Sequence, residues 1–154
     1  MLFKTNCNKI MIKVNRLTDY ATLIICEMAT NKSDIISAKS LSEKTKISET
    51  TVIKLLKMLC KKGLLASHRG ISGGYELIKK IDEINILNVV EAIEGDISLT
   101  LCGKNSLETC EYNTDCKVKH GWNKINNLFM LALQSFTIKD FINDSTYFEL
   151  KKIS

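Results

Sequence analysis

Three cysteines in the second half of the chain are the residues best suited to hold a metal. Cys102, Cys110 and Cys116 are separated by seven and then five residues, in a segment without helical or strand periodicity. Three thiolates form an incomplete ligand set, because iron–sulfur clusters and zinc sites usually take four ligands. The spacing matches neither a C-x-x-C zinc ribbon nor a ferredoxin motif. It therefore indicates a metal without indicating which one.

The fourth ligand has two candidates. His120 follows Cys116 by four residues, and Asp19 stands at the start of the first predicted helix. Glu111 and Asp115 are nearer the cysteines but are typical of solvated acids. The alternative is that the three thiols are incidental and His120 is an ordinary helix-terminal residue.

The other three cysteines are not expected to bind metal. Cys26 and Cys60 fall on apolar stripes of predicted helices and should be small core residues. Cys7 lies in residues 1–11, a predicted disordered extension. No apolar run approaches the roughly 18 residues that span a bilayer, and the first ten residues lack a secretory signal. We expect a cytoplasmic protein with reduced thiols and no membrane association.

The composition favours a helical domain. The chain has 154 residues, of which 45% are hydrophobic, and it contains no proline. That length suits one compact domain or a small domain that carries an appended dimerisation element, and the hydrophobic content excludes disorder as the main description. The absence of proline favours helices over a many-turned β-sandwich.

Charge is distributed in two opposed blocks. Residues 39–80 hold ten Lys and Arg against three acids, whereas residues 81–116 hold one Lys against eight acids, within a net charge of +5. A basic block followed by an acidic one indicates that the first faces a polyanion and the second has another task.

Periodicity predicts three helices in the first half. Thr18 is the expected N-cap of the first helix, Ser37 caps a second over residues 38–45, and Ser48 caps a third that stops at Gly63. The buried stripe of the first helix is predicted to include Ala21, Ile24, Ile25, Met28 and Ala29, and that of the third Val52, Leu55, Leu56, Leu59 and Cys60. Two short helices joined by a tight turn, the second basic outside, favour a helix-turn-helix.

The third helix has the residue types that read DNA. A recognition helix needs short polar side chains at its start for base edges and Lys or Arg along its flank for phosphates. The candidates are Ser48, Glu49, Thr50 and Thr51 for bases, and Lys54, Lys57 and Lys61 for phosphates. The alternative is that these lysines form an ordinary solvated helix face. The glycine-rich hairpin that follows the helix favours DNA binding over this alternative.

That hairpin is the expected wing. Strands are predicted over 64–67 and 75–78, and the three glycines between them allow positive φ and close backbone approach. The wing residues expected to contact DNA are His68, Arg69, Gly70, Ser72, Gly73, Gly74 and Tyr75. Arg69 suits the minor groove or a phosphate.

Three more helices are expected. One covers residues 86–94 up to Gly95 and buries Leu87, Val90 and Ile93; a long one begins at Trp122; and Thr137 caps a last short one. The long helix carries an apolar stripe of Trp122, Ile125, Leu128, Phe129, Ala132 and Phe136. Because the winged domain is complete without it, this stripe is predicted to form a dimer interface.

The predicted fold class is therefore mainly α with a small β-hairpin wing, a winged helix-turn-helix plus a long C-terminal dimerisation helix. Its expected regions are 1–11 (disordered extension), 12–96 (DNA-binding domain), 97–120 (cluster-binding loop), 121–143 (dimerisation helix) and 144–154 (tail).

The sequence resembles the IscR/NsrR-type (Rrf-two) transcription regulators over roughly residues 12–142. The resemblance is carried by the three cysteines, Trp122, and the segments Leu17–Ala21, Gly63–Leu65, His68–Gly70, Gly73–Tyr75 and Glu91–Gly95. It is closest to the regulators of SUF-system iron–sulfur assembly.

The resemblance implies a homodimeric winged-helix repressor or dual regulator of iron–sulfur assembly genes that binds a palindromic double-stranded DNA operator. It implies an iron–sulfur cluster, [2Fe–2S] favoured over [4Fe–4S], held by Cys102, Cys110 and Cys116. Cluster loss, or attack by oxygen or nitric oxide, would change operator affinity. Neither catalysis nor a small-molecule substrate is implied.

Two departures from the family pattern concern the ligands. The gap between Cys102 and Cys110 is longer than the five residues found in IscR, and the family's ligand His aligns with Lys119 rather than His120. Asp19 matches the position where NsrR uses an aspartate from the partner subunit, so it is the favoured fourth ligand. The family usually begins near Met11, so residues 1–10 resemble an extension or an alternative start.

Two other classes of protein compete with this interpretation. In a winged-helix regulator with a structural zinc site, the metal would not be sensory. A redox enzyme or electron carrier is disfavoured, because the sequence shows no nucleotide motif, substrate site or second cluster motif.

Overall fold

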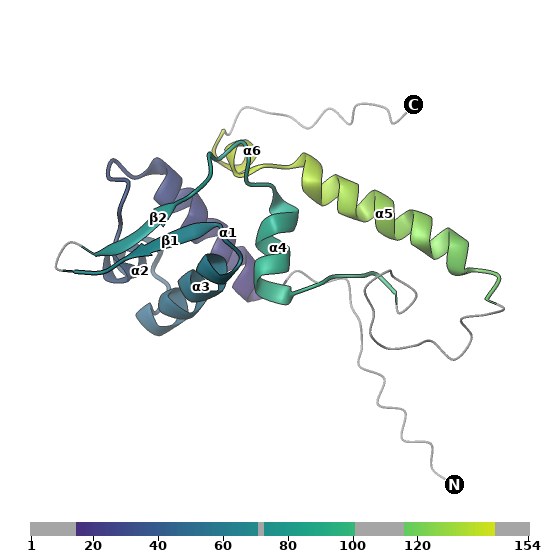
Figure 1. Cartoon of the computed structure of the whole chain (residues 1–154), viewed down its shortest axis with the longest axis horizontal. Coiled ribbons are helices and arrows are strands. Elements are labelled where there is room, and N and C mark those ends of the chain that lie inside the picture. The colour runs from purple at the N-terminus through teal and green to yellow at the C-terminus, as the bar shows by residue number, and fades with distance from the viewer. Residues whose placement is uncertain (1–14, 71–72, 101–115, 144–154) are drawn as a thin grey trace, which may run out of the picture.

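The structure is a computed structural model that describes residues 15–70, 73–100 and 116–143. Within these ranges the chain is mostly helical, with one two-stranded antiparallel sheet. The elements are α1 (Arg16–Thr30), α2 (Ala38–Thr45), α3 (Glu49–Lys61), β1 (Leu65–His68), β2 (Gly74–Leu77), α4 (Ile86–Glu94), α5 (Lys119–Ser135) and α6 (Ile138–Ile142). Helices α1 to α3 and the hairpin form one body, from which α5 extends beyond α4 (Figure 1).

Helix α1 starts earlier than its sequence predicts. Its N-cap is Asn15, whose side chain accepts a hydrogen bond from the Leu17 amide. Thr18 as N-cap is therefore wrong: this residue lies inside the first turn, and its side chain is buried against Glu94 of α4. The predicted apolar stripe is confirmed, with Ala29 only half-buried at its end.

Helices α2 and α3 begin after the predicted N-cap residues and bury the predicted faces, although the Ser48 side chain makes no cap hydrogen bond. The Ser37 side chain accepts a hydrogen bond from the Ser40 amide at the start of α2, and Leu41 is fully buried. Helix α3 begins after Ser48 and turns its apolar stripe into the core, where Val52, Leu55, Leu56 and Leu59 are fully buried. Full burial of four aliphatic side chains fixes which face of α3 is left for solvent.

The hairpin is attached to the linker between α1 and α2. Its strands pair from Leu65 opposite Leu77 to His68 opposite Gly74, one residue away from the predicted ranges. Ile36 adds a bridge to Tyr75 through two backbone hydrogen bonds of 3.0 and 2.9 Å. This isolated bridge anchors the two-stranded hairpin to the residue that lies two positions before α2.

The chain returns to this body after α5. Helix α4 has its predicted bounds, with Leu87 and Val90 buried and Ile93 half-buried, and α5 begins three residues before Trp122. Helix α6 is capped by Thr137, as predicted. The Ile138 amide donates to the Ile84 carbonyl, and the Ile138 side chain is fully buried in the core. Both ends of the segment from α4 to α6 thus contact the same body.

Candidate nucleic-acid interface and cysteine segment

The solvent face of α3 is basic and polar. Lys54, Lys57 and Lys61 are exposed because the opposite face of the helix is buried, as the predicted periodicity requires. Long lysine side chains on a helix face can reach phosphates while the body of the helix packs on the core. The three lysines are therefore accessible to a polyanion.

The start of α3 presents a cluster of hydroxyl groups. Ser48 Oγ lies 2.8 Å from Thr51 Oγ1 and 3.4 Å from Thr50 Oγ1, and the Ser48 side chain makes no cap hydrogen bond to the helix. Ser48, Glu49 and Thr50 are exposed, and Thr51 is half-buried. These groups can donate and accept hydrogen bonds at the end of the helix that would enter a groove.

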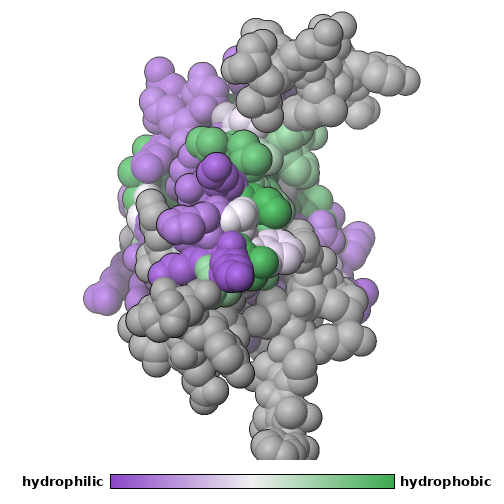
Figure 2. All heavy atoms as spheres, turned by 90° about the vertical axis from the view of Figure 1, so that its right-hand side faces the viewer, coloured by the Kyte–Doolittle hydropathy of each residue, from purple (hydrophilic) through white to green (hydrophobic). Residues whose placement is uncertain are grey.

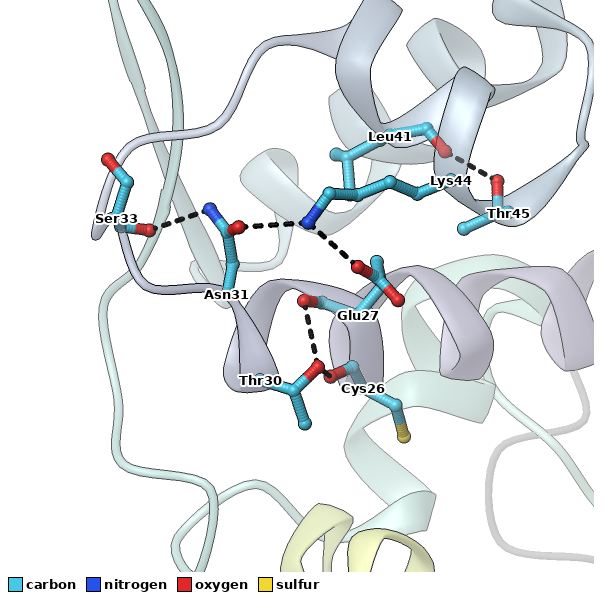
Figure 3. A network of polar contacts seen from close by, with 8 residues as sticks. All are labelled: Cys26, Glu27, Thr30, Asn31, Ser33, Leu41, Lys44 and Thr45. Atoms are coloured by element: carbon cyan, nitrogen blue, oxygen red, sulfur yellow. Dashed lines mark hydrogen bonds and ion pairs between the residues drawn. The ribbon is translucent and has the colours of Figure 1, made fainter.

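One lysine of the basic block is already neutralised. The Lys44 ammonium lies 3.0 Å from Glu27 Oε1 and donates to Asn31 Oδ1 at 2.9 Å, so the end of α2 is linked to the end of α1 (Figure 3). The Asn31 side chain in turn donates to the Ser33 carbonyl. Lys44 holds two helices together and is a poorer candidate for phosphate contact than the lysines of α3.

The polar residues of the hairpin differ in their exposure to solvent. His68 Nε2 lies 2.7 Å from Glu76 Oε2 across the two strands, and Arg69 is exposed at the tip. Tyr75 is half-buried against the core. Ser72 lies outside the described residues. Arg69 is therefore the wing cation best placed for a phosphate or a groove.

The three glycines of the tip have two distinct roles. Gly70 alone among them has a positive φ, of 117°. A Cβ on Gly73 would lie 2.5 Å from the His68 carbonyl oxygen, and one on Gly74 would lie 2.6 Å from that of Ile36. Gly70 is therefore needed for its positive φ, and Gly73 and Gly74 are needed because other backbone atoms approach them closely. The sequence predicted both roles for the glycines of this loop.

Cys116 is the one predicted cysteine ligand that the structure describes. It is half-buried just before α5, and its carbonyl accepts a hydrogen bond from the Lys119 amide at 3.3 Å. Cys102 and Cys110 lie outside the described ranges. Asp19 is exposed on the first turn of α1, and His120 is exposed on the first turn of α5. Among residues 15–70, 73–100 and 116–143, no three His, Cys, Asp or Glu side chains gather into a metal site.

Cys26 and Cys60 have the surroundings of structural thiols. Both are half-buried and pack against the core, and this burial raises the pKa of each thiol. The cause is desolvation, which disfavours the charged thiolate. A thiol kept protonated is a poor metal ligand, so both residues match the predicted core role.

One face of α5 is apolar and is left exposed by the rest of the described chain. Trp122, Ile125 and Leu128 are exposed, as is Leu131 at 58%, while Phe129 is half-buried, Ala132 is exposed, and Phe136 follows the helix as its C-cap. Hydrophobic residues are visible among hydrophilic ones on the side of the molecule shown in Figure 2. An apolar helix face of this kind is typical of an interaction surface.

None of the helices in the described ranges has the length and apolarity needed to cross a membrane.

Sequence reasoning missed two long-range polar contacts near these sites. Thr18 Oγ1 donates to Glu94 Oε1 at 2.6 Å, and the Leu99 amide donates to Asn126 Oδ1 at 3.0 Å. The only sequence signal for the first was that both residues fall in segments shared with the resembled family. Nothing in the local pattern indicated the second.

A mostly helical chain with a two-stranded hairpin and a basic exposed helix has the architecture of a DNA-binding transcriptional regulator. The particular family follows from comparison with known proteins. The chain belongs to the Rrf2 family, described as iron-dependent transcriptional regulators, whose family model matches residues 14–144.

Individual relatives agree with this assignment. The HTH-type transcriptional regulator NsrR of Bacillus licheniformis is 29% identical over 132 residues, which cover 85% of this chain and 92% of the relative. The solved structure of CymR, the global cysteine regulator of B. subtilis, is similar with a TM-score of 0.67 at 27% identity, over 86% of this chain and 97% of that one. IscR of T. potens has the same fold, with a TM-score of 0.63 at 24% identity, over 88% and 89% of the two chains.

Proposed function

We propose that the protein is a homodimeric repressor that binds a palindromic DNA operator through a winged helix-turn-helix and controls genes of iron–sulfur cluster assembly. The observation that carries the proposal is the two-sided character of α3. Its inner face is fully buried, and its outer face presents three exposed lysines and a hydroxyl cluster. This is what a recognition helix requires.

The proposed contacts divide by position. Ser48, Glu49, Thr50 and Thr51 would meet base edges, and Lys54, Lys57 and Lys61 would meet phosphates. The wing would add contacts from His68, Arg69, Gly70, Ser72, Gly73, Gly74 and Tyr75. Arg69 is the wing residue that we expect to contribute most, because it is an exposed cation at the tip.

The dimer would form through the exposed apolar face of α5. The residues proposed for it are Trp122, Ile125, Leu128, Phe129, Ala132 and Phe136. Pairing two copies would cover this apolar surface and place two α3 helices in major grooves about one DNA turn apart.

The donor set fits an iron–sulfur cluster in its chemistry. Cys102, Cys110 and Cys116 supply three thiols, and Cys116, which lies three residues before α5, is half-buried and free of a disulfide. Asp19, exposed on α1, would supply a fourth ligand to the site of the partner subunit, with His120 as the other candidate. A bound cluster, [2Fe–2S] favoured over [4Fe–4S], would supply a redox-sensitive group whose loss reports iron, oxygen or nitric oxide status. The chain's own residues would hold that group and bind DNA.

Anaerobic purification tests the sensory part of the proposal. We expect a coloured protein with visible absorption and acid-labile sulfide. Cys102→Ala should remove both and alter operator binding, while Cys60→Ala, a change of the same type at a residue that packs on the core, should keep the colour. A colourless protein that carries zinc would overturn the proposed cluster.

Specific DNA binding tests the proposed role as a repressor that recognises an operator. The full-length protein should select a palindromic sequence from random duplex DNA. Failure to select any sequence, with the metal bound and with it removed, would overturn the proposed role as a repressor.

A further inference from the structure

Residues 94–99 are held at both ends by side chains from other helices. At one end, Glu94 Oε1 accepts hydrogen bonds from Thr18 Oγ1 at 2.6 Å and from the Asn15 amide at 3.2 Å. At the other end, the Leu99 amide donates to Asn126 Oδ1 at 3.0 Å. The segment therefore connects the first turn of α1 to the middle of α5.

The place of Glu94 is explained by α1 rather than by its own helix. A carboxylate on the last residue of α4 is disfavoured by the negative end of that helix dipole. The same carboxylate is favoured at the start of α1, where amides lack helical partners and the dipole is positive. Thr18 is buried, with 2% of its surface exposed, so its hydroxyl needs the Glu94 acceptor.

Asn126 is the one buried residue of α5, whose other residues are exposed or half-buried. Only 7% of its surface is exposed, less than that of any other residue of α5, and its neighbours Ile125 and Asn127 are exposed. Asparagine is a weak helix former, so helix stability does not explain why it occupies position 126. The hydrogen bond from the Leu99 amide to its side chain explains it.

Local hydrogen bonds also join each end of residues 94–99 to the neighbouring chain. Gly95 has a φ of 80°, and its amide donates to the Glu91 carbonyl at 3.1 Å. The Ser98 hydroxyl donates to the Thr100 carbonyl at 2.7 Å and accepts from the Thr100 amide at 3.4 Å. These bonds tie the start of residues 94–99 to α4 and the end to Thr100, so the segment is held near both ends by local bonds as well as by the two side-chain anchors.

We propose that Glu94 and Asn126 are positioning residues that make residues 94–99 a mechanical link between α5 and the first turn of α1. A change in α5, which begins three residues after Cys116, is passed through Asn126 and Leu99 to Glu94. It then reaches the turn that carries Thr18 and Asp19. The last step, an effect on operator affinity, rests on the proposed function.

Hydrogen exchange in the metal-free, full-length protein tests the link without any cluster. Asn126→Ala should speed exchange of the Leu99 amide by about tenfold, as loss of one hydrogen bond implies, and should also speed exchange of the distant Asn15 amide severalfold. Asn127→Ala is the matched control, because it makes the same change in helix propensity at an exposed neighbour. Faster exchange at Leu99 with wild-type exchange at Asn15 would overturn the link.

Hydrogen exchange can also be measured in variants of Glu94, at the α1 end of residues 94–99. Glu94→Ala should speed exchange at Asn15 and at Leu99, whereas Glu94→Gln retains an acceptor oxygen and should remain close to wild type. Glu91→Ala, on the same helix, is the control. A Glu94→Gln variant as fast as Glu94→Ala would overturn the role assigned to the acceptor.

Operator affinity separates this inference from the proposed function. The probe is a duplex that the wild-type protein selects from random DNA, and its Kd is measured with the metal bound and with it removed. If the two Kd values differ for the wild type, their ratio should fall toward one in Glu94→Ala and Asn126→Ala and persist in both controls. A ratio kept by the two variants overturns the inference. Equal Kd values in the wild type overturn the sensing function, and the link is then decided by exchange at Asn15.

Discussion

Gly74 and Ile36 approach each other so closely that no side chain fits between them. A Cβ on Gly74 would lie 2.6 Å from the carbonyl oxygen of Ile36 and 2.8 Å from its carbonyl carbon. Beside this contact, two backbone hydrogen bonds join Ile36 to Tyr75. The attachment of the hairpin to the α1–α2 linker therefore requires glycine at position 74.

Gly74→Ala should lower the free energy of unfolding by about 1–3 kcal/mol, because the added methyl group meets backbone that must move. Urea denaturation followed by circular dichroism measures it. Gly121→Ala is the control: a Cβ there meets nothing within 4 Å, and the residue lies in α5, so stability should rise by up to about 1 kcal/mol. Equal destabilisation by both substitutions would contradict the close approach.

Lys46 is held in a conformation that suits glycine better. It is the C-cap of α2, with φ 61° and ψ 17°, in the turn that leads to α3. A non-glycine residue in this region is disfavoured by about 1–2 kcal/mol. Lys46→Gly relieves this strain and should raise the free energy of unfolding by a few tenths to about 1 kcal/mol. The gain is smaller than the strain itself, because glycine also gains entropy in the unfolded chain, which favours unfolding.

Lys39→Gly is the control for this change. It removes the same side chain from an exposed position inside α2, where glycine lowers stability by about 1 kcal/mol. Denaturant titration of both variants gives the comparison. If Lys46→Gly destabilises as much as Lys39→Gly, the left-handed conformation of Lys46 carries no strain.

Elements whose boundaries depend on local residues were predictable from the sequence. Ser37 and Thr137 cap the helices that follow them, and Gly95 ends α4, because each acts on backbone groups within a few residues. The buried face of α3 followed from its period for the same reason.

Contacts between distant residues were not predictable in this way. Thr18 has the residue type and position of an N-cap, but its partner is Glu94, 76 residues further along the chain. The neutralisation of Lys44 by Glu27 depends on how α1 and α2 pack. Likewise, the close approach that requires Gly74 depends on where Ile36 lies. The cysteine segment has no period, so the sequence could indicate its chemistry but not its geometry.

Asp140 should make part of the stability depend on acid pH. The Thr137 amide and hydroxyl donate to Asp140 Oδ2 at 2.8 and 2.7 Å, and these bonds, the amide first, hold the carboxyl pKa below its ordinary value. Because the folded pKa is the lower one, the stabilisation is present above the unfolded pKa of about 3.9 and is lost as pH falls through the folded value.

Asp140→Asn should therefore flatten the fall in unfolding free energy as the pH drops below about 5. Urea denaturation at several pH values measures the slope. Thr137→Val, which removes one of the two donors, should give an intermediate slope. A profile of Asp140→Asn that runs parallel to the wild type would show that this cap does not titrate with folding.

Lys54 should contribute to DNA binding chiefly through a phosphate. Lys54→Ala should weaken binding to duplex DNA, and the effect should shrink as salt rises, because a phosphate contact releases counterions. In a plot of log K against log salt concentration, the slope should become shallower by about 0.9 for each phosphate that is no longer neutralised. Fluorescence anisotropy with random-sequence duplex at several salt concentrations measures it.

Lys44→Ala is the matched control for Lys54→Ala. The Lys44 ammonium is already paired with Glu27 and Asn31, so its removal should leave the salt slope unchanged. Both substitutions remove one positive charge from the same basic block, and a difference between them therefore reports position rather than net charge. An unchanged slope in Lys54→Ala, or an equal change in both variants, would show that the exposed face of α3 does not lie against the DNA backbone.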